Sequence, residues 1–493
     1  MLYVGVDLGT SSVKMLLMDQ AGKIEKIVSR EYPLSIPKPG WSEQNPTDWW
    51  NAFVDGFGEL TSECDKKQIA GISFSGQMHG LVILDEKDEV IRPAILWNDG
   101  RTQKECDYLN ITIGRKVISS YTGNMALTGF TAPKILWVKE NEPDNFAKIK
   151  KIMLPKDYIA YRLSGVHCTD VSDASGMLLL DVKNKKWSKE MIEICGISED
   201  QLAKLHESYQ PVGTVTKEIA ALLGISETCK VVAGGGDQAV GAVGTGTVGD
   251  GMCSVSLGTS GTVFIVSKDF AVDDANALHS FAHADGQFHF MGCTLAAAAS
   301  NKWWMDEIIR TKDYPAEQVG ITADKLGNNG VYYLPYLMGE RTPHNNPNAR
   351  GTFVGMMMNT SREDMTQAVL EGVAFSLRDA LEIARSFGVK IERIRINGGG
   401  AKSPLWCKIM ANVLNVKVDK INSAEGPAFG AAILAAVGCG EYATVTEAAG
   451  KLISVVETTD QDEKLVELYN ARYNAWKQLY PALKNVYDVM AEI

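Results

Sequence analysis

The stretch VVAGGGDQAVGAVGTGTVGDGMCSVSLGTSGTVFIVS (Val231–Ser267) decides the fold, because it holds two glycine-rich segments of different character. The first is a glycine triplet followed by a single acid, Asp237. The second is the turn at Gly258 and Thr259, which lies between two β-prone runs and predicts two strands joined by a tight connection. Glycines let the backbone approach a bound group closely. We therefore expect a ligand at both places, with N-capping of a helix as the alternative role of Asp237.

The same turn occurs near the start of the chain. Leu8–Ser11 and Leu257–Ser260 both read Leu-Gly-Thr-Ser, and each follows one β-rich run and precedes another. A repeat of this kind, displaced by about half the chain, predicts an internal duplication and two related domains that face each other across a cleft. Strands and helices alternate along both halves, which is typical of an α/β protein. We expect the chain to cross between the domains within Ala239–Asp250, so that the domains are 1–245 and 246–493.

Composition narrows the class of protein. A chain of 493 residues is too long for one hydrophobic core, and 45% hydrophobic with 22% charged residues is ordinary for a globular protein. The net charge of −11 speaks against a nucleic-acid or anionic-membrane partner, which would need a basic surface. No apolar run reaches the about 18 residues of a membrane span and no basic leader precedes the first strand, so we expect a cytoplasmic protein. The nine cysteines are scattered singly, which predicts reduced thiols and no zinc knuckle.

A third glycine turn, Gly398–Gly400, follows the predicted strand Ile391–Ile396. Turns that end a strand point successive backbone N–H groups at a phosphate. None of the three turns has the spacing of a P-loop or of the dinucleotide-binding fingerprint. Each alone is more typical of a hairpin, but the three together favour a nucleotide site.

Two carboxylates complete a possible reaction. Asp7 ends the first strand directly before its glycine turn, where an acid would repel a phosphate and therefore suits a ligand of Mg²⁺. The alternative for Asp7 is a turn-capping role. Asp237 can orient a substrate hydroxyl and accept its proton, as an aspartate does in kinases. The pattern predicts transfer of the γ-phosphoryl group of a nucleotide to an alcohol.

Over nearly its entire length the sequence resembles the FGGY family of carbohydrate kinases, within the actin/hexokinase/Hsp70 superfamily. The segments that carry the match include VGVDLGTSSVK, SGQMHGLVILD, GFTAPKILWVKEN, VVAGGGDQAVGAVG, SLGTSGTVF, YLPYLMGERTPHNNPNARGTF, NGGGAKSPLW and EGPAFGAAILA. The resemblance implies two actin-like (ribonuclease H-like) domains, each a mixed five-stranded sheet with flanking helices, around a central cleft. It also implies ATP with Mg²⁺ and a small-molecule sugar as ligands. Dimers are frequent in the family, which makes a homodimer one expectation.

The resemblance also assigns residues. Asp237 matches the family's catalytic base and Asp7 its magnesium-associated acid. The nucleotide-binding positions that match are Thr10, Lys14, Gly258, Thr259, Gly399, Gly400 and Ala401. The sugar-binding positions are Met78, His79, Asp237 and Gln238. The match implies phosphorylation of D-xylulose to D-xylulose 5-phosphate, with ribulose, gluconate or another polyol as the alternative substrate. A different alternative function is that of a catalytically silent, sugar-binding regulator.

Residue chemistry supports part of this assignment. An uncharged polyol needs neutral donors and acceptors beside an apolar wall, which the imidazole of His79 and the thioether of Met78 supply. Without the resemblance, both are more typical of structural residues. The family members that act on xylulose often carry Asn where this chain has Gln238, which puts strict ketopentose selectivity in doubt.

Other segments stay open. Residues 97–101 could frame the sugar pocket, or Asp99 and Arg101 could pair across a turn. Residues 340–344 are expected to form a cleft-side loop with a salt-bridged structural role. Trp41, Trp49 and Trp50 are expected in the core, and Trp41 could also border the sugar site.

Overall fold

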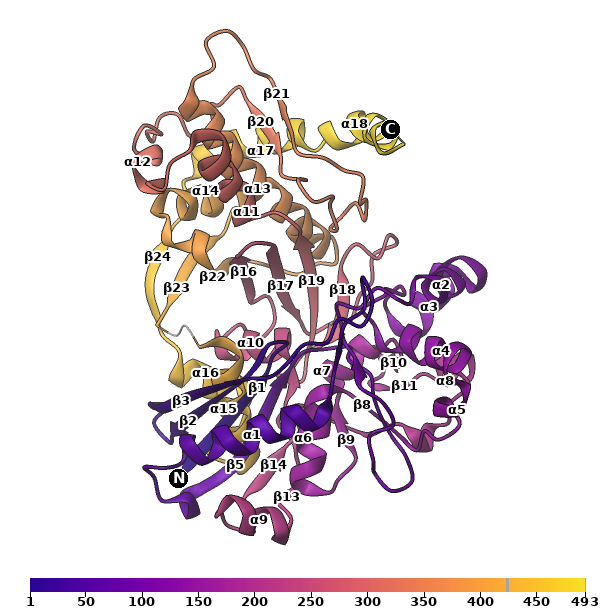
Figure 1. The fold of residues 1–493 in the computed structure, drawn as a ribbon. Helices are drawn as coiled ribbons and strands as arrows, with labels where there is room; N and C mark the ends of the chain where they lie inside the picture. Colours follow the sequence, from indigo (N-terminus) through magenta and orange to yellow (C-terminus); the bar gives the residue numbers. More distant parts are fainter. Residues whose placement is uncertain (423–424, 493) are drawn as a thin grey trace.

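The computed structural model describes residues 1–422 and 425–492, which form two lobes, each built on a seven-stranded mixed sheet (Figure 1). The first sheet has the order β13-β14-β5-β1-β2-β3, and β15 also pairs with β5. Its strands are β1 (Leu2–Leu8), β2 (Ser12–Asp19), β3 (Ile24–Glu31), β5 (Ile69–Gly76), β13 (Pro211–Thr214), β14 (Lys230–Val232) and β15 (Gly235–Gly236).

The second sheet has the order β18-β19-β17-β16-β22-β23-β24. Its strands are β16 (Cys253–Leu257), β17 (Gly261–Ser267), β18 (His279–Ala282), β19 (Phe288–Thr294), β22 (Arg393–Asn397), β23 (Lys417–Ile421) and β24 (Val455–Thr459).

Five strands of each sheet correspond in order and direction. β1 is antiparallel to β2 and parallel to β5, just as β16 is antiparallel to β17 and parallel to β22. β3 and β14 extend the first set as β19 and β23 extend the second. The internal duplication is therefore confirmed. The sheets have seven strands instead of the expected five because β13 and β15 join the first sheet, and β18 and β24 join the second.

Helices and short ribbons complete the lobes. The helices of the first half are α1 (Pro46–Leu60), α2 (Gln103–Asp107), α3 (Arg115–Thr122), α4 (Thr131–Asn141), α5 (Pro143–Phe146), α6 (Pro155–Ser164), α7 (Val171–Ala174), α8 (Lys189–Cys195), α9 (Lys217–Leu223) and α10 (Asp237–Gly244). Those of the second half are α11 (Ala298–Trp303), α12 (Tyr314–Val319), α13 (Arg362–Ser386), α14 (Pro404–Leu414), α15 (Gly426–Cys439), α16 (Val445–Leu452), α17 (Glu463–Trp476) and α18 (Leu479–Ala491). Two-stranded ribbons pair β4 (Glu43–Gln44) with β7 (Ala94–Ile95), β6 (Val82–Leu84) with β8 (Lys151–Met153), β9 (Cys168–Asp170) with β12 (Lys204–His206), β10 (Leu180–Asp181) with β11 (Lys186–Trp187), and β20 (Tyr332–Leu334) with β21 (Thr352–Val354).

The central strand β1 is covered on both faces, which explains its nearly continuous apolar sequence. On one face, Val4 and Val6 lie in the core that includes Trp49 and Phe53 of α1. On the other face, Tyr3 belongs to a cluster formed largely by α15. The strand is thereby packed on both of its faces.

Helix α15 comes from the second half of the chain but packs on the first sheet, beside α10 (Figure 1). The two helices cross in backbone contact: a Cβ on Gly430 would lie 2.0 Å from the carbonyl oxygen of Val240, and one on Gly244 would lie 1.8 Å from that of Gly426. Larger residues at either glycine would force the helices apart. This contact ties the second half of the chain to the first lobe, while the boundary at 245/246 stays a prediction.

Two further features are the lack of a membrane-spanning helix among the described residues and the state of the cysteines. None of the described helices has both the length and the apolar character needed to cross a membrane. The nine cysteines are all free, as their single spacing predicts.

Candidate active site

Asp237 lies where the first sheet meets helix α10. The preceding residues Gly235 and Gly236 pair with the last two residues of β5, and Asp237 then begins the helix. Gly236 is the N-cap and no side chain caps this end, so the expected alternative that Asp237 is the N-cap is wrong. Its carboxylate is instead free to face the cleft, where the partial positive charge of the helix N-terminus favours its ionised form.

Asp237 interacts electrostatically with Asp7. Burial and then the nearby Asp7 carboxylate raise the pKa of Asp237 to about 7, against hydrogen bonds from Gln238. Burial raises the pKa of Asp7 to about 6, with the Lys14 ammonium acting in the opposite direction. Two enclosed carboxylates of like charge favour binding of a cation between or beside them.

This donor set fits Mg²⁺. Magnesium in kinases is held by one or two carboxylates together with phosphate oxygens and water, and Asp7 supplies such a carboxylate. Within residues 1–422 and 425–492, no group of three or more His, Cys, Asp or Glu side chains is arranged as a metal cage. The residues therefore suit a metal ion whose remaining ligands come from a nucleotide.

The first glycine turn joins β1 to β2 and lies at the cleft end of both strands. Thr10 is held by side chains from two other segments: its hydroxyl accepts a hydrogen bond from Nε1 of Trp97 at 2.9 Å, and its carbonyl accepts one from Nε2 of Gln44 at 2.6 Å. Lys14 lies opposite Asp7 in the strand register. Its Nζ is 3.1 Å from a carboxylate oxygen of Glu425, directly before α15. The turn is thus fastened to other elements, and Lys14 links the two halves of the chain.

The second and third turns lie side by side, because β16 and β22 are parallel neighbours that end together. Gly398 has φ of 86°, and a Cβ there would lie 2.6 Å from the carbonyl group of Leu257. Gly399, Gly400 and Ala401 follow in a 3₁₀ turn. In the second turn, Thr259 follows Gly258, and its carbonyl accepts from the backbone N–H of Ala297 at 3.0 Å.

A cavity of about 940 Å³ adjoins both turns. Asp237 and Gln238 line it from the first lobe. Gly258, Gly398 and Ala401 line it from the second. The predicted base and the second and third glycine turns therefore share one cavity. The first turn, with Thr10 and Lys14, and the pair Met78 and His79 are not among the residues that line it.

The predicted sugar residues lie directly after β5. Met78 is buried and packs on the strand that leads to the base: a Cβ on Gly236 would be 2.8 Å from its sulfur. His79 has φ of 69°, a left-handed conformation that is uncommon outside glycine. Its Nδ1 lies 2.8 Å from the carbonyl oxygen of Gly176 and must donate to it, since a carbonyl only accepts.

The imidazole of His79 is neutral at physiological pH. Burial, and secondly the nearby Lys134, lower the pKa of His79 to about 3. With the proton on Nδ1, the other ring nitrogen Nε2 is a hydrogen-bond acceptor. The ring of Phe130 lies 4.7 Å from the imidazole, centroid to centroid, and supplies an apolar wall.

Of the two hypotheses for residues 97–101, the structure supports the structural one for Asp99 and Arg101. Arg101 donates to Asp99 from Nε at 2.9 Å and from Nη2 at 2.7 Å, and its guanidinium stacks 3.7 Å from the ring of Trp41. Asp99 and Arg101 thus pair across a turn, as one of the two hypotheses stated. Trp97 is different, because its indole is 47% exposed and binds Thr10. Sequence reasoning missed this contact, for which an aromatic residue beside a polar turn is only a weak signal.

Glu340 is buried, but its role is not the expected salt bridge. Its carboxylate accepts hydrogen bonds from the hydroxyl of Thr294 at 2.5 Å and from the backbone N–H groups of Leu295 and Arg341 at 3.1 and 2.7 Å. Among the described residues no cationic side chain pairs with it. The loop is therefore held by donors from β19 and its own backbone.

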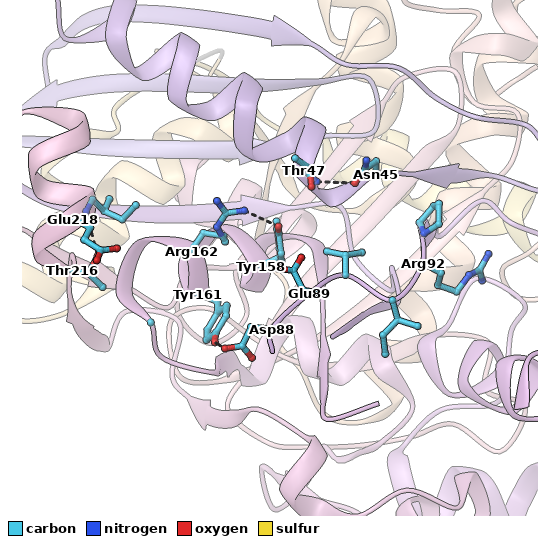
Figure 2. Close-up of a pocket in the computed structure, with 15 residues that line it drawn as sticks. Asn45, Thr47, Asp88, Glu89, Arg92, Tyr158, Tyr161, Arg162, Thr216 and Glu218 are labelled. Carbon is cyan, nitrogen blue, oxygen red and sulfur yellow. Dashed lines mark hydrogen bonds between the residues drawn. The ribbon is translucent and has the colours of Figure 1, made fainter. Parts of the chain in front are cut away.

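A further cavity, of about 830 Å³, lies on the first lobe and is drawn in Figure 2. Arg162 donates to the hydroxyl of Tyr158 there at 2.9 Å, and Asn45 and Thr47 lie at the start of α1. None of the predicted site residues lines this cavity, and none of the three predicted phosphate-binding turns adjoins it. The cavity with Asp237 is therefore the candidate active site.

Comparisons with known proteins agree with this geometry. The model of the N-terminal domain of the FGGY family of carbohydrate kinases matches residues 2–244, and that of the C-terminal domain matches residues 253–439. The chain is 40% identical to the xylulose kinase of Bacillus subtilis over 98% of its own length and 97% of that protein.

Two solved structures are similar over the whole chain. A protein named as a xyloylose kinase from Brucella ovis is 38% identical, with a TM-score of 0.92 over 99% of this chain and 100% of the other. The gluconate kinase from Lactobacillus acidophilus is 27% identical, also with a TM-score of 0.92, over 99% of each chain. Both family models, the two-lobed actin-like fold and these identities lead to one conclusion: the chain belongs to the FGGY family of carbohydrate kinases.

Proposed function

We propose that the chain transfers the γ-phosphoryl group of ATP to the 5-hydroxyl of D-xylulose, which yields D-xylulose 5-phosphate and ADP. One observation carries the proposal. Asp237 follows the strand that packs on Met78, and its side chain lines the cavity that Gly258 and Gly398 border. This position of a single carboxylate, between Met78 and the two glycine turns, supports a base that acts between a sugar and a nucleotide.

The sugar side supplies binding and orientation. Nε2 of His79 accepts a hydrogen bond from a hydroxyl of the sugar, while Met78 provides apolar contact. Gln238, exposed beside the base, donates or accepts a further hydrogen bond. All three side chains are neutral, which suits an uncharged polyol.

The nucleotide side holds the phosphates with backbone N–H groups. The turns at Gly258 and Gly399 provide these groups, together with Thr10 and Lys14 from the first lobe. When bound at Asp7, Mg²⁺ neutralises charge on the phosphate oxygens. Lys402 and Lys420 also line this cavity, so in a protein of net charge −11 their ammonium groups add positive potential near ATP to that of the backbone N–H groups and the metal.

Asp237 is proposed to act as the general base. Its carboxylate accepts the proton of the 5-hydroxyl as that oxygen bonds to the γ-phosphorus, and the bond from the γ-phosphorus to the departing ADP oxygen breaks. A pKa of about 7 leaves a substantial ionised fraction at neutral pH and favours proton acceptance. Closure of the two lobes would exclude water from the reacting atoms.

The experiment is an ADP-release assay across D-xylulose, D-ribulose, D-gluconate and glycerol at equal concentrations. We expect D-xylulose to give the highest kcat/KM. A higher kcat/KM with gluconate or ribulose would overturn the choice of sugar. ADP release that no sugar stimulates would instead support a catalytically silent regulator.

We also propose a cytoplasmic location and a homodimer. The location rests on the sequence features described above, and the homodimer rests on the family resemblance alone. Size-exclusion chromatography with light scattering tests the second.

A further inference from the structure

The sugar-binding histidine is held in an unusual backbone conformation. His79 adopts φ of 69° between β5 and β6, where the chain turns sharply. Non-glycine residues persist in this region only when surrounding contacts hold them there. Specific contacts must therefore hold the backbone of His79.

Two side chains of α4 bind the carbonyl oxygen of His79. Oγ1 of Thr131 donates to it at 3.0 Å, and Nζ of Lys134 donates to it at 2.8 Å. Both residues are fully buried. They are three positions apart in the first turns of the helix, so they lie on one face of it. A lysine in this position would ordinarily be solvated, which makes its burial informative.

Lys134 also fastens the neighbouring segment. Its Nζ donates to the carbonyl oxygen of Gly129 at 2.5 Å, directly before Phe130, whose ring packs against the imidazole of His79. Gly129 in turn is in close contact with the carbonyl of Trp97, since a Cβ there would lie 2.6 Å from that oxygen. One ammonium or amine group therefore connects the backbone of His79 to the aromatic wall beside its ring.

The electrostatics agree with a positioning role. Nζ of Lys134 forms no ion pair with any described carboxylate, and burial lowers the pKa of Lys134 to about 7 although Asp99 acts in the opposite direction. The two carbonyl acceptors match the two N–H bonds of a neutral amine. A buried lysine without a carboxylate partner is costly to retain for stability alone.

We propose that Lys134 and Thr131 are positioning residues of the sugar site, which hold His79 so that Nε2 of its imidazole faces the sugar. The proposal rests on the proposed sugar kinase function, because it assumes that His79 binds the sugar. Neither residue touches the sugar itself. Their loss is expected to change the affinity for sugar while the nucleotide turns, which belong to other elements, stay intact.

The test compares KM for D-xylulose, KM for ATP and kcat in four variants. Thr131→Val removes one of the two hydrogen bonds to His79, and we expect a rise in sugar KM of about threefold to tenfold. Thr131→Ser keeps the hydroxyl and should restore the wild-type value. Lys134→Met keeps the length of the apolar stem and should raise sugar KM by more than about tenfold, since it removes donors to two carbonyls. Ile135→Val, a buried neighbour on the same helix, is the matched control and should leave sugar KM unchanged.

The outcomes are distinguishable. A residue with a general structural role would lower the active fraction and hence kcat, and would leave both KM values unchanged; that result for Thr131→Val and Lys134→Met overturns the proposal. If Lys134→Met does not fold, the Thr131→Val and Thr131→Ser pair still decides. The proposed function fails separately, if the wild-type protein does not phosphorylate D-xylulose; the same KM comparison is then made with whichever sugar it does accept.

Discussion

Replacing Asp237 by asparagine should reduce catalysis and increase stability at the same time. Asparagine has almost the same shape but cannot accept the proton of the sugar hydroxyl. General-base catalysis contributes a factor of about 10² to 10⁴, so kcat of Asp237→Asn should fall by at least about a hundredfold. Sugar binding should change little, because Met78 and His79 are retained.

The stability gain follows from the pKa of Asp237. In the unfolded chain this carboxyl has a pKa near 3.8, and in the folded chain about 7. Between these values the folded protein holds a proton that the unfolded chain has lost, so wild-type stability decreases as pH rises through this window. The full displacement corresponds to about 4 kcal/mol, which we reduce to about 1–2 kcal/mol because part of the side chain faces the solvent-filled cavity.

Differential scanning calorimetry of both proteins at pH 5 and pH 8 measures this gain. Unfolding 493 residues carries an entropy of about 1 kcal/mol/K, so Asp237→Asn should have a Tm higher by about 1–2 °C at pH 8. The difference should be smaller at pH 5, where the wild-type carboxyl is protonated in the folded chain. Asp274→Asn, at an exposed position, is the control and should shift neither Tm nor kcat. A kcat for Asp237→Asn within about threefold of wild type would refute the general-base role, and a Tm lower than wild type at pH 8 would refute the electrostatic reasoning.

Three further predictions concern neighbouring residues. Asp7→Asn removes a like charge that helps to raise the pKa of Asp237. The acid limb of the pH profile of kcat/KM for sugar, measured on the residual activity, should therefore move below pH 7. An unchanged limb would show that the two carboxylates do not interact. His79→Ala should raise sugar KM by at least about tenfold with ATP KM unchanged, and an effect on ATP KM alone would place the imidazole outside the sugar site. Lys14→Met should raise ATP KM but change the free energy of unfolding by no more than about 1 kcal/mol, because its pair with Glu425 is partly exposed; a large loss of stability in chemical denaturation would contradict a nucleotide-binding role.

The repeat and the glycine turns could be read from the sequence because they are local signals. The Leu-Gly-Thr-Ser repeats at Leu8–Ser11 and Leu257–Ser260 correspond to equivalent turns in the two sheets. The triplet at Gly398–Gly400 likewise follows a strand, as predicted. A turn depends on its own few residues and on the strands that flank it.

Contacts between distant segments could not be predicted in this way. The packing of α15 on the first sheet depends on the close approach of α10 and α15 at Gly244 and Gly430. Small residues so far apart in the sequence give no local signal that they will be in contact. The burial of Lys134 also depends on contacts with segments that are distant in the sequence. In sequence it is one more cation in a helix, and only the approach of the His79 carbonyl gives it a specific role.

The central claim is that Asp237 lies between the reacting hydroxyl and the nucleotide turns. The most direct measurement is a crystal structure of the chain with D-xylulose, Mg²⁺ and a non-hydrolysable ATP analogue. We predict the 5-hydroxyl of the sugar within about 3 Å of a carboxylate oxygen of Asp237, with the γ-phosphate facing that hydroxyl from the turns at Gly258 and Gly399. A sugar bound with no hydroxyl within hydrogen-bond reach of Asp237, or a γ-phosphate on the far side of these turns, would contradict it.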